Sequence, residues 1–301
     1  MPRKRKSTEP PEGAILLTTY AELLEYALGW SRGNLSFVMV VGPRGIQKST
    51  VFEQATADTE VCKIDGNSTA FGAYRTLYEH RDHPVIIDDV DGIFGCPNFV
   101  KLLKALCDTK PRKRVAWIND RTTRNLGDLP PYFSTTSSVV LIANEWLTLN
   151  ENVAAVQDRG HCLFFDPPPV EIHMRTALWF DDQEIFDFVA EHLHLVGKLS
   201  MRHYVLAKEL KNDGKDWQKR LLGMWLQGPE LIAARLMADT SFSTEAARVE
   251  AFRVQGGGCK QTFYTIRNHL RLDDPQNVPK ITLDNQPLKT VPFKCHHAPK
   301  A

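Results

Sequence analysis

The chain has 301 residues, of which 43% are hydrophobic and 24% are charged, and its formal net charge is +1. This composition is typical of a globular protein and excludes a mostly disordered chain, while the length favours two domains and leaves room for a small third. No apolar run exceeds five residues, far short of the about 20 that a bilayer-spanning helix needs. The six cysteines lie far apart without a C-x-x-C pair, which argues against a zinc ribbon or a disulfide framework and favours a reducing, cytoplasmic location.

Residues 1–13 contain four basic residues and three prolines and are expected to form a disordered basic arm. Beyond them, short apolar runs alternate with stretches of helical periodicity. Strands are expected at 35–41, 61–64, 85–87, 114–118, 139–143 and 162–165, and helices at 19–30, 48–57, 69–81 and 99–107. Buried strands separated by helices are typical of a parallel sheet covered on both faces, so the predicted fold class is α/β, with its core at residues 14–170.

The strand pattern stops at three consecutive prolines, Pro167–Pro169, where we expect a domain boundary. Residues 171–239 show only helical periodicity and are expected to form an all-helical second unit. Residues 240–272 predict two further helices around Gly256, Gly257 and Gly258. Residues 273–301 hold several prolines and no clear period, so they are expected to form an irregular tail.

A phosphate-binding loop is expected directly after the strand that ends at Val41. The template G-x-x-x-x-G-K-[ST] between a strand and a helix places Gly42, Lys48 and Ser49 at its fixed positions, although Gln47 replaces its second glycine. Lys48 would pair with the β- and γ-phosphates, and Ser49 would place its hydroxyl on Mg²⁺. The candidate nucleotide-binding residues are Gly42, Pro43, Arg44, Gly45, Ile46, Gln47, Lys48, Ser49 and Thr50. The alternative interpretation is an ordinary strand–helix turn that ends in Lys-Ser.

Two acids follow the strand at 85–87. Asp88 is a candidate magnesium ligand and Asp89 a candidate base that orients or deprotonates the attacking water. Asn144, after the strand at 139–143, can bond the γ-phosphate or the water, or it is only a turn residue. Arg159, before the strand at 162–165, can reach the γ-phosphate of a neighbouring subunit, or it is a solvated arginine in a turn.

In this order, the motifs resemble those of the AAA+ ATPases over residues 14–213. The resemblance implies ATP and Mg²⁺ as ligands, self-association into a ring or filament, and a helical lid that supplies a second sensor arginine. Arg202, at the start of an expected helix, matches that position, although an ordinary surface arginine is the alternative. The family pattern places glutamate where this chain has Asp89, so slow hydrolysis is expected.

Two basic regions are candidates for DNA binding. The second C-terminal helix places Phe263, Ile266 and Leu270 on one face, and the helix pair resembles a helix-turn-helix. Residues 101–124 carry eight Lys or Arg and two Asp. The DNA-binding candidates are Lys260, Gln261, Tyr264, Arg267, Asn268 and Arg271 on the helix, and Arg112, Lys113 and Arg114 in the loop. The alternatives are a helical hairpin that closes the lid and a solvated loop.

The sequence therefore predicts an oligomeric ATPase that acts on DNA, without membrane contact, in replication, transposition or a related process of a mobile element, with other replication or recombination proteins as further partners. One rival is a DNA-binding regulator that uses ATP as a ligand and hydrolyses it poorly, which Gln47 and Asp89 favour. A second rival is a partner-remodelling ATPase without DNA contact.

Overall fold

A computed structural model describes residues 13–65, 68–89, 96–117, 128–144, 158–270 and 283. The predicted basic arm, except Gly13, and the predicted tail, except Leu283, lie outside these residues, as does Arg271. The chain divides into two compact units, Met1–Pro167 and Pro168–Ala301. This division falls within a few residues of the expected boundary at the three prolines. Within the described residues, no helix is both long and apolar enough to cross a bilayer.

A six-stranded parallel sheet forms the centre of the first unit and confirms the predicted α/β class. Its strand order is β1-β8-β2-β7-β4-β3. The strands are β1 (Ile15–Leu17), β2 (Phe37–Val41), β3 (Cys62–Asp65), β4 (Val85–Asp88), β7 (Val139–Ala143) and β8 (His161–Phe165). The central strands β2 and β7 are buried at every position, as expected for strands covered on both faces. The edge strand β1 was not predicted from the sequence.

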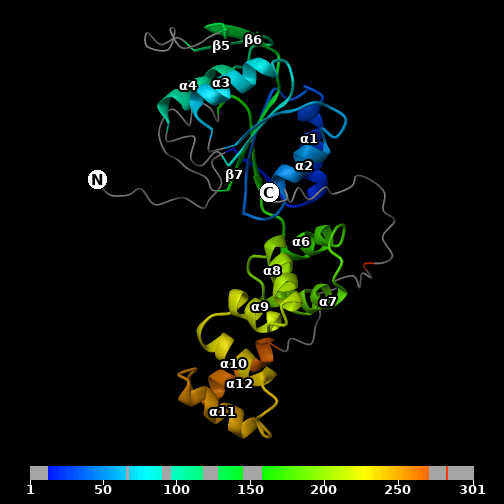
Figure 1. Cartoon of the computed structure of the whole chain (residues 1–301). Helices are drawn as coiled ribbons and strands as arrows, with labels where there is room; N and C mark the ends of the chain where they lie inside the picture. Colours follow the sequence, from blue (N-terminus) through cyan, green and yellow to red (C-terminus); the bar gives the residue numbers. More distant parts are fainter. Residues whose placement is uncertain are drawn as a thin grey trace, which may run out of the picture. The chain divides into compact units, whose positions relative to one another are not determined.

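Among the described residues, helices cover both faces of this sheet, with α3 and α4 on one side and α1 and α2 on the other (Figure 1). They are α1 (Tyr20–Ser31), α2 (Lys48–Gln54), α3 (Ala70–Glu79) and α4 (Pro97–Leu106). A capping box starts α1, because the Thr19 hydroxyl accepts the Glu22 N–H and the Glu22 carboxylate accepts the Thr19 N–H. Apolar residues of α3, α4 and the sheet form a continuous core that includes Tyr74, Leu103 and Leu141.

A separate antiparallel hairpin, β5 (Lys113–Ala116) and β6 (Tyr132–Thr135), lies in the chain between β4 and β7. Only its first strand was predicted. Alternation along β5 turns Lys113 inward and Arg114 outward. Lys113 is 1% exposed, and its ammonium donates to the Ser137 carbonyl at 2.7 Å. The expectation that Lys113 contacts DNA is therefore corrected: its charge is used inside the protein.

The second unit is entirely helical within the described residues, as expected. Its elements are α6 (Pro169–Thr176), α7 (Gln183–Glu191), the 3-10 turn η2 (Leu193–Leu195), α8 (Met201–Asn212), α9 (Trp217–Trp225), α10 (Gly228–Ala238), α11 (Glu245–Val254) and α12 (Lys260–Leu270).

A buried histidine lies in the core that α6, α7 and α8 share. The His173 ring stacks on Phe186 with ring centroids 3.9 Å apart, and its Nδ1 lies 2.8 Å from the Tyr204 hydroxyl. Burial lowers the pKa of His173 to about 4, so the imidazole is neutral at pH 7.

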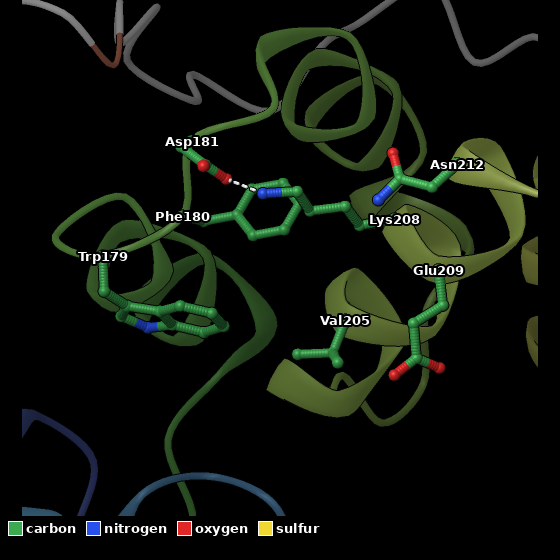
Figure 2. A pocket seen from close by; sticks show the side chains of 7 residues that line it. All are labelled: Trp179, Phe180, Asp181, Val205, Lys208, Glu209 and Asn212. Atoms are coloured by element: carbon green, nitrogen blue, oxygen red, sulfur yellow. Dashed lines mark hydrogen bonds and ion pairs between the residues drawn. The ribbon is translucent and has the colours of Figure 1, made fainter. Parts of the chain in front are cut away.

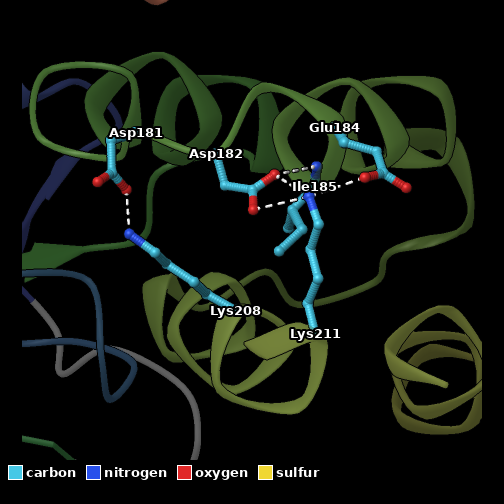
Figure 3. Close-up of polar contacts among 6 residues, drawn as sticks. All are labelled: Asp181, Asp182, Glu184, Ile185, Lys208 and Lys211. Carbon is cyan, nitrogen blue, oxygen red and sulfur yellow. Dashed lines mark hydrogen bonds and ion pairs between the residues drawn. The ribbon is translucent and has the colours of Figure 1, made fainter. Parts of the chain in front are cut away.

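Ion pairs join the start of α7 to α8 (Figure 3). Lys211 contacts Asp182 at 2.8 Å and Glu184 at 2.7 Å, and Lys208 pairs with Asp181. Burial raises the pKa of Asp182, but the bonds from Lys211 and from the Ile185 N–H outweigh it and hold this pKa below its usual value. Asp182 also caps α7 through that N–H, so one carboxylate fixes both helices.

The last three helices share a hydrophobic cluster of their own, formed by Ala233, Leu236, Val249, Phe252 and Phe263. Helix α10, which the expected division assigns to the lid, thus packs with α11 and α12. The turn between α11 and α12 requires glycine at position 257, because a Cβ there would lie 2.2 Å from the Phe252 ring. The structure thus contains the two predicted C-terminal helices and the glycine turn between them.

Candidate nucleotide-binding site

The loop between β2 and α2 lies at the carboxyl end of the sheet and has the strand–loop–helix context that the template requires. Gly42 allows close packing here, because a Cβ at this position would lie 2.2 Å from the Phe165 carbonyl oxygen of β8. Tyr20 of α1 donates its hydroxyl to the Ile46 carbonyl at 2.9 Å and so anchors the middle of the loop. The sequence identified the loop but not this anchor; the only available signal was the predicted buried face of the helix that contains Tyr20.

Gln47 occupies the position of the second template glycine and adopts a left-handed conformation, with φ 60° and ψ 32°. This conformation explains why the template has glycine at this position, since a side chain makes it costly. The Gln47 side-chain oxygen is buried and has no hydrogen-bond partner among the described residues. The loop therefore retains the glycine-type backbone despite the substitution.

Lys48, the first residue of α2, is 5% exposed, and its ammonium lies inside the loop. It donates to the carbonyls of Gly42 at 2.9 Å and Pro43 at 2.7 Å. It also donates to Asn144 Oδ1 at 3.2 Å. The Lys48 ammonium is thus bonded to oxygens of the loop and of Asn144.

Ser49 and the two acids continue the same network. The Ser49 hydroxyl donates to Asp88 Oδ2 at 2.6 Å, and Asp88 Oδ1 accepts the Asp89 N–H at 2.8 Å. Asn144 Nδ2 donates to Asp89 Oδ1 at 3.2 Å. Asp89 itself has a positive φ of 55°, a strained conformation of the kind that concentrates at functional sites.

The strand order explains why these five residues meet. Strand β7 lies between β2 and β4, and all three run parallel, so their carboxyl ends share one edge of the sheet. Lys48 and Ser49 begin the helix that follows β2 and its loop. Asp88 is the last residue of β4, Asp89 follows it, and Asn144 follows β7. The structure thus brings together the predicted loop residues, the acids and the amide in one connected set.

The oxygens of Ser49 and Asp88 fit a magnesium ion. Mg²⁺ prefers a hydroxyl, a carboxylate, waters and phosphate oxygens as ligands, usually with only one or two protein carboxylates. The 2.6 Å separation between the Ser49 hydroxyl and Asp88 Oδ2 shows that both donors point to the same place. The donor set therefore suits a hard divalent cation next to the loop.

Arg159 lies near the amino ends of the strands, whereas the loop lies at their carboxyl ends. It precedes β8, which runs parallel to β2, so about 16 Å of strand separates it from the loop of its own chain. Its guanidinium donates to the Lys104 carbonyl in the last turn of α4. The structure therefore does not bring Arg159 to the other predicted catalytic residues of this chain.

Arg202 is exposed in the first turn of α8, after the cap residue Ser200. It belongs to the second unit, Pro168–Ala301, whereas the loop belongs to the first. The same unit contains a pocket of about 270 Å³ between the segment 179–181 and α8 (Figure 2). Its lining residues are Trp179, Phe180, Asp181, Val205, Lys208, Glu209 and Asn212, which include none of the predicted site residues.

The predicted recognition helix α12 is exposed at Lys260, Gln261 and Asn268. Arg267 is instead paired with Glu245 of α11, and it lies 4.8 Å from the centroid of the Tyr264 ring. Its charge is thus partly neutralised within the helix pair. Phe263 is fully buried as expected, whereas Ile266 and Leu270 are only partly buried against the same cluster.

Of the three basic candidates in the hairpin, two remain at the surface. Arg112 and Arg114 are exposed, and the Arg114 guanidinium lies 4.1 Å from the centroid of the Tyr132 ring. Tyr132 is 50% exposed, so the pair presents a flat cationic and aromatic surface.

The described residues form an α/β domain with a strand–loop–helix site at the carboxyl end of its sheet, followed by a helical unit. No protein-family model matches the chain. A curated relative, an uncharacterised 36.7 kDa protein of the nrdC–mobD intergenic region of Enterobacteria phage T4, is 30% identical over 97 residues. That match spans 30% of this chain and 30% of the phage protein.

Three solved structures are similar to the chain, each at 13% identity and a TM-score of 0.40. The Walker-type ATPase PABY2304 of Pyrococcus abyssi matches 85% of this chain and 89% of its own. PCH-2 of C. elegans matches 72% and 68%, and a DNA replication initiation factor matches 86% and 84%.

Proposed function

We propose that the chain binds ATP with Mg²⁺ in the loop after β2 and hydrolyses it, as an AAA+-like ATPase. The observation that carries the proposal is the continuous network from Lys48 through Asn144 and Asp89 to Asp88 and Ser49. A structural turn has no need to join a lysine, a serine, an amide and two acids from three strands at one sheet edge.

Each residue has a distinct task in this proposal. Lys48 exchanges the two loop carbonyls for β- and γ-phosphate oxygens, and the helix N-terminus of α2 adds backbone N–H groups for the anion. Mg²⁺, held by Ser49 and Asp88, supplies charge neutralisation on the phosphates. Asp89 orients the attacking water or accepts its proton, and the Asn144 amide holds the carboxylate of Asp89 in place.

Nucleotide binding and turnover by the full chain test this function. The parent should bind ATP in a magnesium-dependent manner, and Lys48→Ala should abolish tight binding. Lys63→Ala is the matched control, because Lys63 is an exposed lysine of the same unit that pairs with Glu53. Equal ATP affinity in the parent and in Lys48→Ala would reduce the loop to a structural turn.

Self-association through Arg159 is the second part of the proposal. An arginine about one strand length from its own loop is unsuited to its own nucleotide, and it could serve the loop of a neighbouring copy by exchanging its bond to the Lys104 carbonyl for a phosphate oxygen. Arg202, exposed on the lid helix α8, is proposed as the second sensor arginine. Analytical ultracentrifugation with and without ATP measures the assembly that this role requires.

DNA is the proposed partner, contacted through Lys260, Gln261 and Asn268 of α12 and through Arg112 and Arg114 of the hairpin. The exposed side chains on α12 offer both a charge for phosphates and amides for base edges. Lys260→Ala should weaken binding to all sequences and flatten the salt dependence by about one unit per lost phosphate contact. Arg253→Ala on the neighbouring helix α11, where Arg253 already pairs with Glu250, is the matched control.

A process such as replication or transposition of a mobile element fits this set of proposed activities. The partial similarity to a phage protein is in line with such a setting. The strained Gln47 and the short Asp89 favour the rival function, a regulator that binds ATP and hydrolyses it slowly. Turnover measured with and without duplex DNA separates all three candidates. DNA should stimulate the DNA-acting ATPase, the regulator should turn over slowly in both conditions, and a remodelling ATPase should turn over at the same rate with and without DNA.

A further inference from the structure

Three potential metal ligands meet near the amino ends of β3 and β4, whereas the loop with Lys48 lies at the carboxyl ends of the strands. Glu60 lies two residues before β3, and His83 lies two residues before β4. These strands pair in parallel with Cys62 opposite Val85, and the Cys62 N–H donates to the Pro84 carbonyl at 2.9 Å. The register therefore places Glu60 directly across from His83.

The third ligand comes from the end of α3. His80 is the C-cap residue of this helix, and its N–H donates to the Thr76 carbonyl at 3.0 Å. The turn that follows is closed by the His83 N–H, which donates to the His80 carbonyl at 3.2 Å. Asp82 fixes the same turn from the other side, because its carboxylate accepts the Thr136 N–H at 2.7 Å. The backbone that carries both histidines is thus held before any ligand binds.

The three ligand atoms lie as close together as in a zinc site, or slightly farther apart. Glu60 Oε1 lies 3.3 Å from His80 Nδ1 and 3.8 Å from His83 Nδ1, and the three ligand atoms all lie within 4.8 Å of one another. Zinc bonds of about 2.0–2.1 Å in a tetrahedron place neighbouring ligand atoms about 3.3–3.4 Å apart. One pair already has this spacing, and small rotations of the exposed Glu60 and of the partly buried histidine side chains bring the other pairs to it.

A second observation points to a ligand at the same place. The His83 side chain is 38% exposed, but its Nδ1 atom is shielded from solvent and has no hydrogen-bond partner among the described residues, since Glu60 is too distant for a bond. A buried polar atom without a partner is costly, and structures normally provide one. A cation between His83 and Glu60 would satisfy this nitrogen and neutralise the exposed carboxylate together.

We propose that Glu60, His80 and His83 bind one zinc ion that ties the end of α3 to the starts of β3 and β4. Two imidazole nitrogens and one carboxylate oxygen favour Zn²⁺ over the oxygen-seeking Mg²⁺ and Ca²⁺, and the fourth position is left for water. Because the site lies at the sheet edge away from Lys48, it is separate from the magnesium at Ser49 and Asp88. The zinc ion stabilises the first unit by binding only its folded form.

Zinc titration of the metal-stripped full chain against a chromophoric chelator tests the proposal. The tail contains Cys295, His296 and His297, so the double variant His296→Asn, His297→Asn is measured alongside to remove that competing set. This control should retain one tight zinc ion per chain, and zinc should raise its melting temperature. His83→Asn or His80→Asn introduced into this control should weaken binding more than about 100-fold, since even an outer-shell partner of a ligand contributes about 10–100-fold.

Glu60→Gln keeps the experiment decisive if a histidine variant unfolds, because the Glu60 side chain is 66% exposed and its replacement leaves the core untouched. This variant should also lose tight zinc binding and the zinc-dependent rise in melting temperature. Cobalt in place of zinc should give tetrahedral d–d absorption without thiolate charge transfer. Absence of tight zinc binding in the parent, its loss in the tail variant alone, or unchanged affinity in Glu60→Gln would each overturn the proposal.

Discussion

Replacement of Gln47 by glycine should stabilise the protein, although most substitutions at a ligand-binding loop do the opposite. The left-handed conformation at φ 60° costs a residue with a side chain about 1–2 kcal/mol. The buried side-chain oxygen without a partner adds about 1–3 kcal/mol that glycine removes. Against this, glycine makes the unfolded chain more flexible, at a cost of about 0.5–1 kcal/mol. The favourable contributions are larger, so Gln47→Gly should gain at least about 1 kcal/mol.

Thermal and urea unfolding of the full chain measure this gain, and each 1 kcal/mol corresponds to about 2–4 °C in Tm for a domain of 150–250 residues. Gln47→Ala is the matched control, because alanine removes the buried oxygen but keeps the cost of a positive φ. The glycine variant should therefore exceed the alanine variant by about 0.5–1 kcal/mol. Equal stability of the two variants, or a loss in Gln47→Gly, would refute the argument that the loop backbone is strained at this position.

Single substitutions at Asp89, Arg159, Lys113 and His173 test the roles of these four residues. Asp89→Asn keeps the partner of Asn144 but removes the proposed base, so ATP binding should persist while turnover falls about 10²–10⁴-fold. Arg159→Ala should lose turnover in an assembly, and mixing it with Lys48→Ala subunits should partly restore activity; absence of rescue would place the arginine's role within its own subunit. Lys113→Met should cost about 1–3 kcal/mol of stability, seen by urea unfolding, because it leaves the Ser137 carbonyl without its donor. The salt slope of DNA binding should stay unchanged in this variant. Burial lowers the pKa of His173 in the folded chain to about 4. Below pH 6.5 the unfolded chain therefore binds a proton at this residue that the folded chain does not bind. Stability should therefore fall by about 2 kcal/mol between pH 7 and pH 4.5, and urea unfolding of His173→Asn should show a smaller fall.

The parallel sheet was predictable because its inner strands are short apolar runs. The run at 139–143 is buried at every position, and no other element fits so short an apolar segment between polar ends. The edge strand β1 escaped prediction because it has three residues and Leu16 is 57% exposed. Strand β6 escaped because its apolar run, Tyr132 and Phe133, has only two residues. Length and edge position, rather than composition, set this limit.

The residues of the candidate site were predictable because each one follows a strand end in a fixed chemical pattern. Their mutual bonds were not, since the contact of Lys48 with Asn144 spans 96 residues and depends on β7 lying next to β2. For Lys113, the predicted role itself was wrong. A lysine in a basic stretch is expected to be exposed, but the alternation of β5 turns it toward the Ser137 carbonyl.

The strand direction also constrains how copies of the chain can assemble. The loop with Lys48 and the acids lies at the carboxyl edge of the sheet, and Arg159 lies at the amino edge. If Arg159 serves the nucleotide of a neighbour, the amino edge of one copy must face the carboxyl edge of the next. Where such a contact joins two different surfaces it is heterologous, and its repetition produces a ring or a helical filament. A two-fold dimer can also place Arg159 of each copy at the loop of the other, but such an assembly stops at two copies, so the number of copies seen by analytical ultracentrifugation separates the two arrangements.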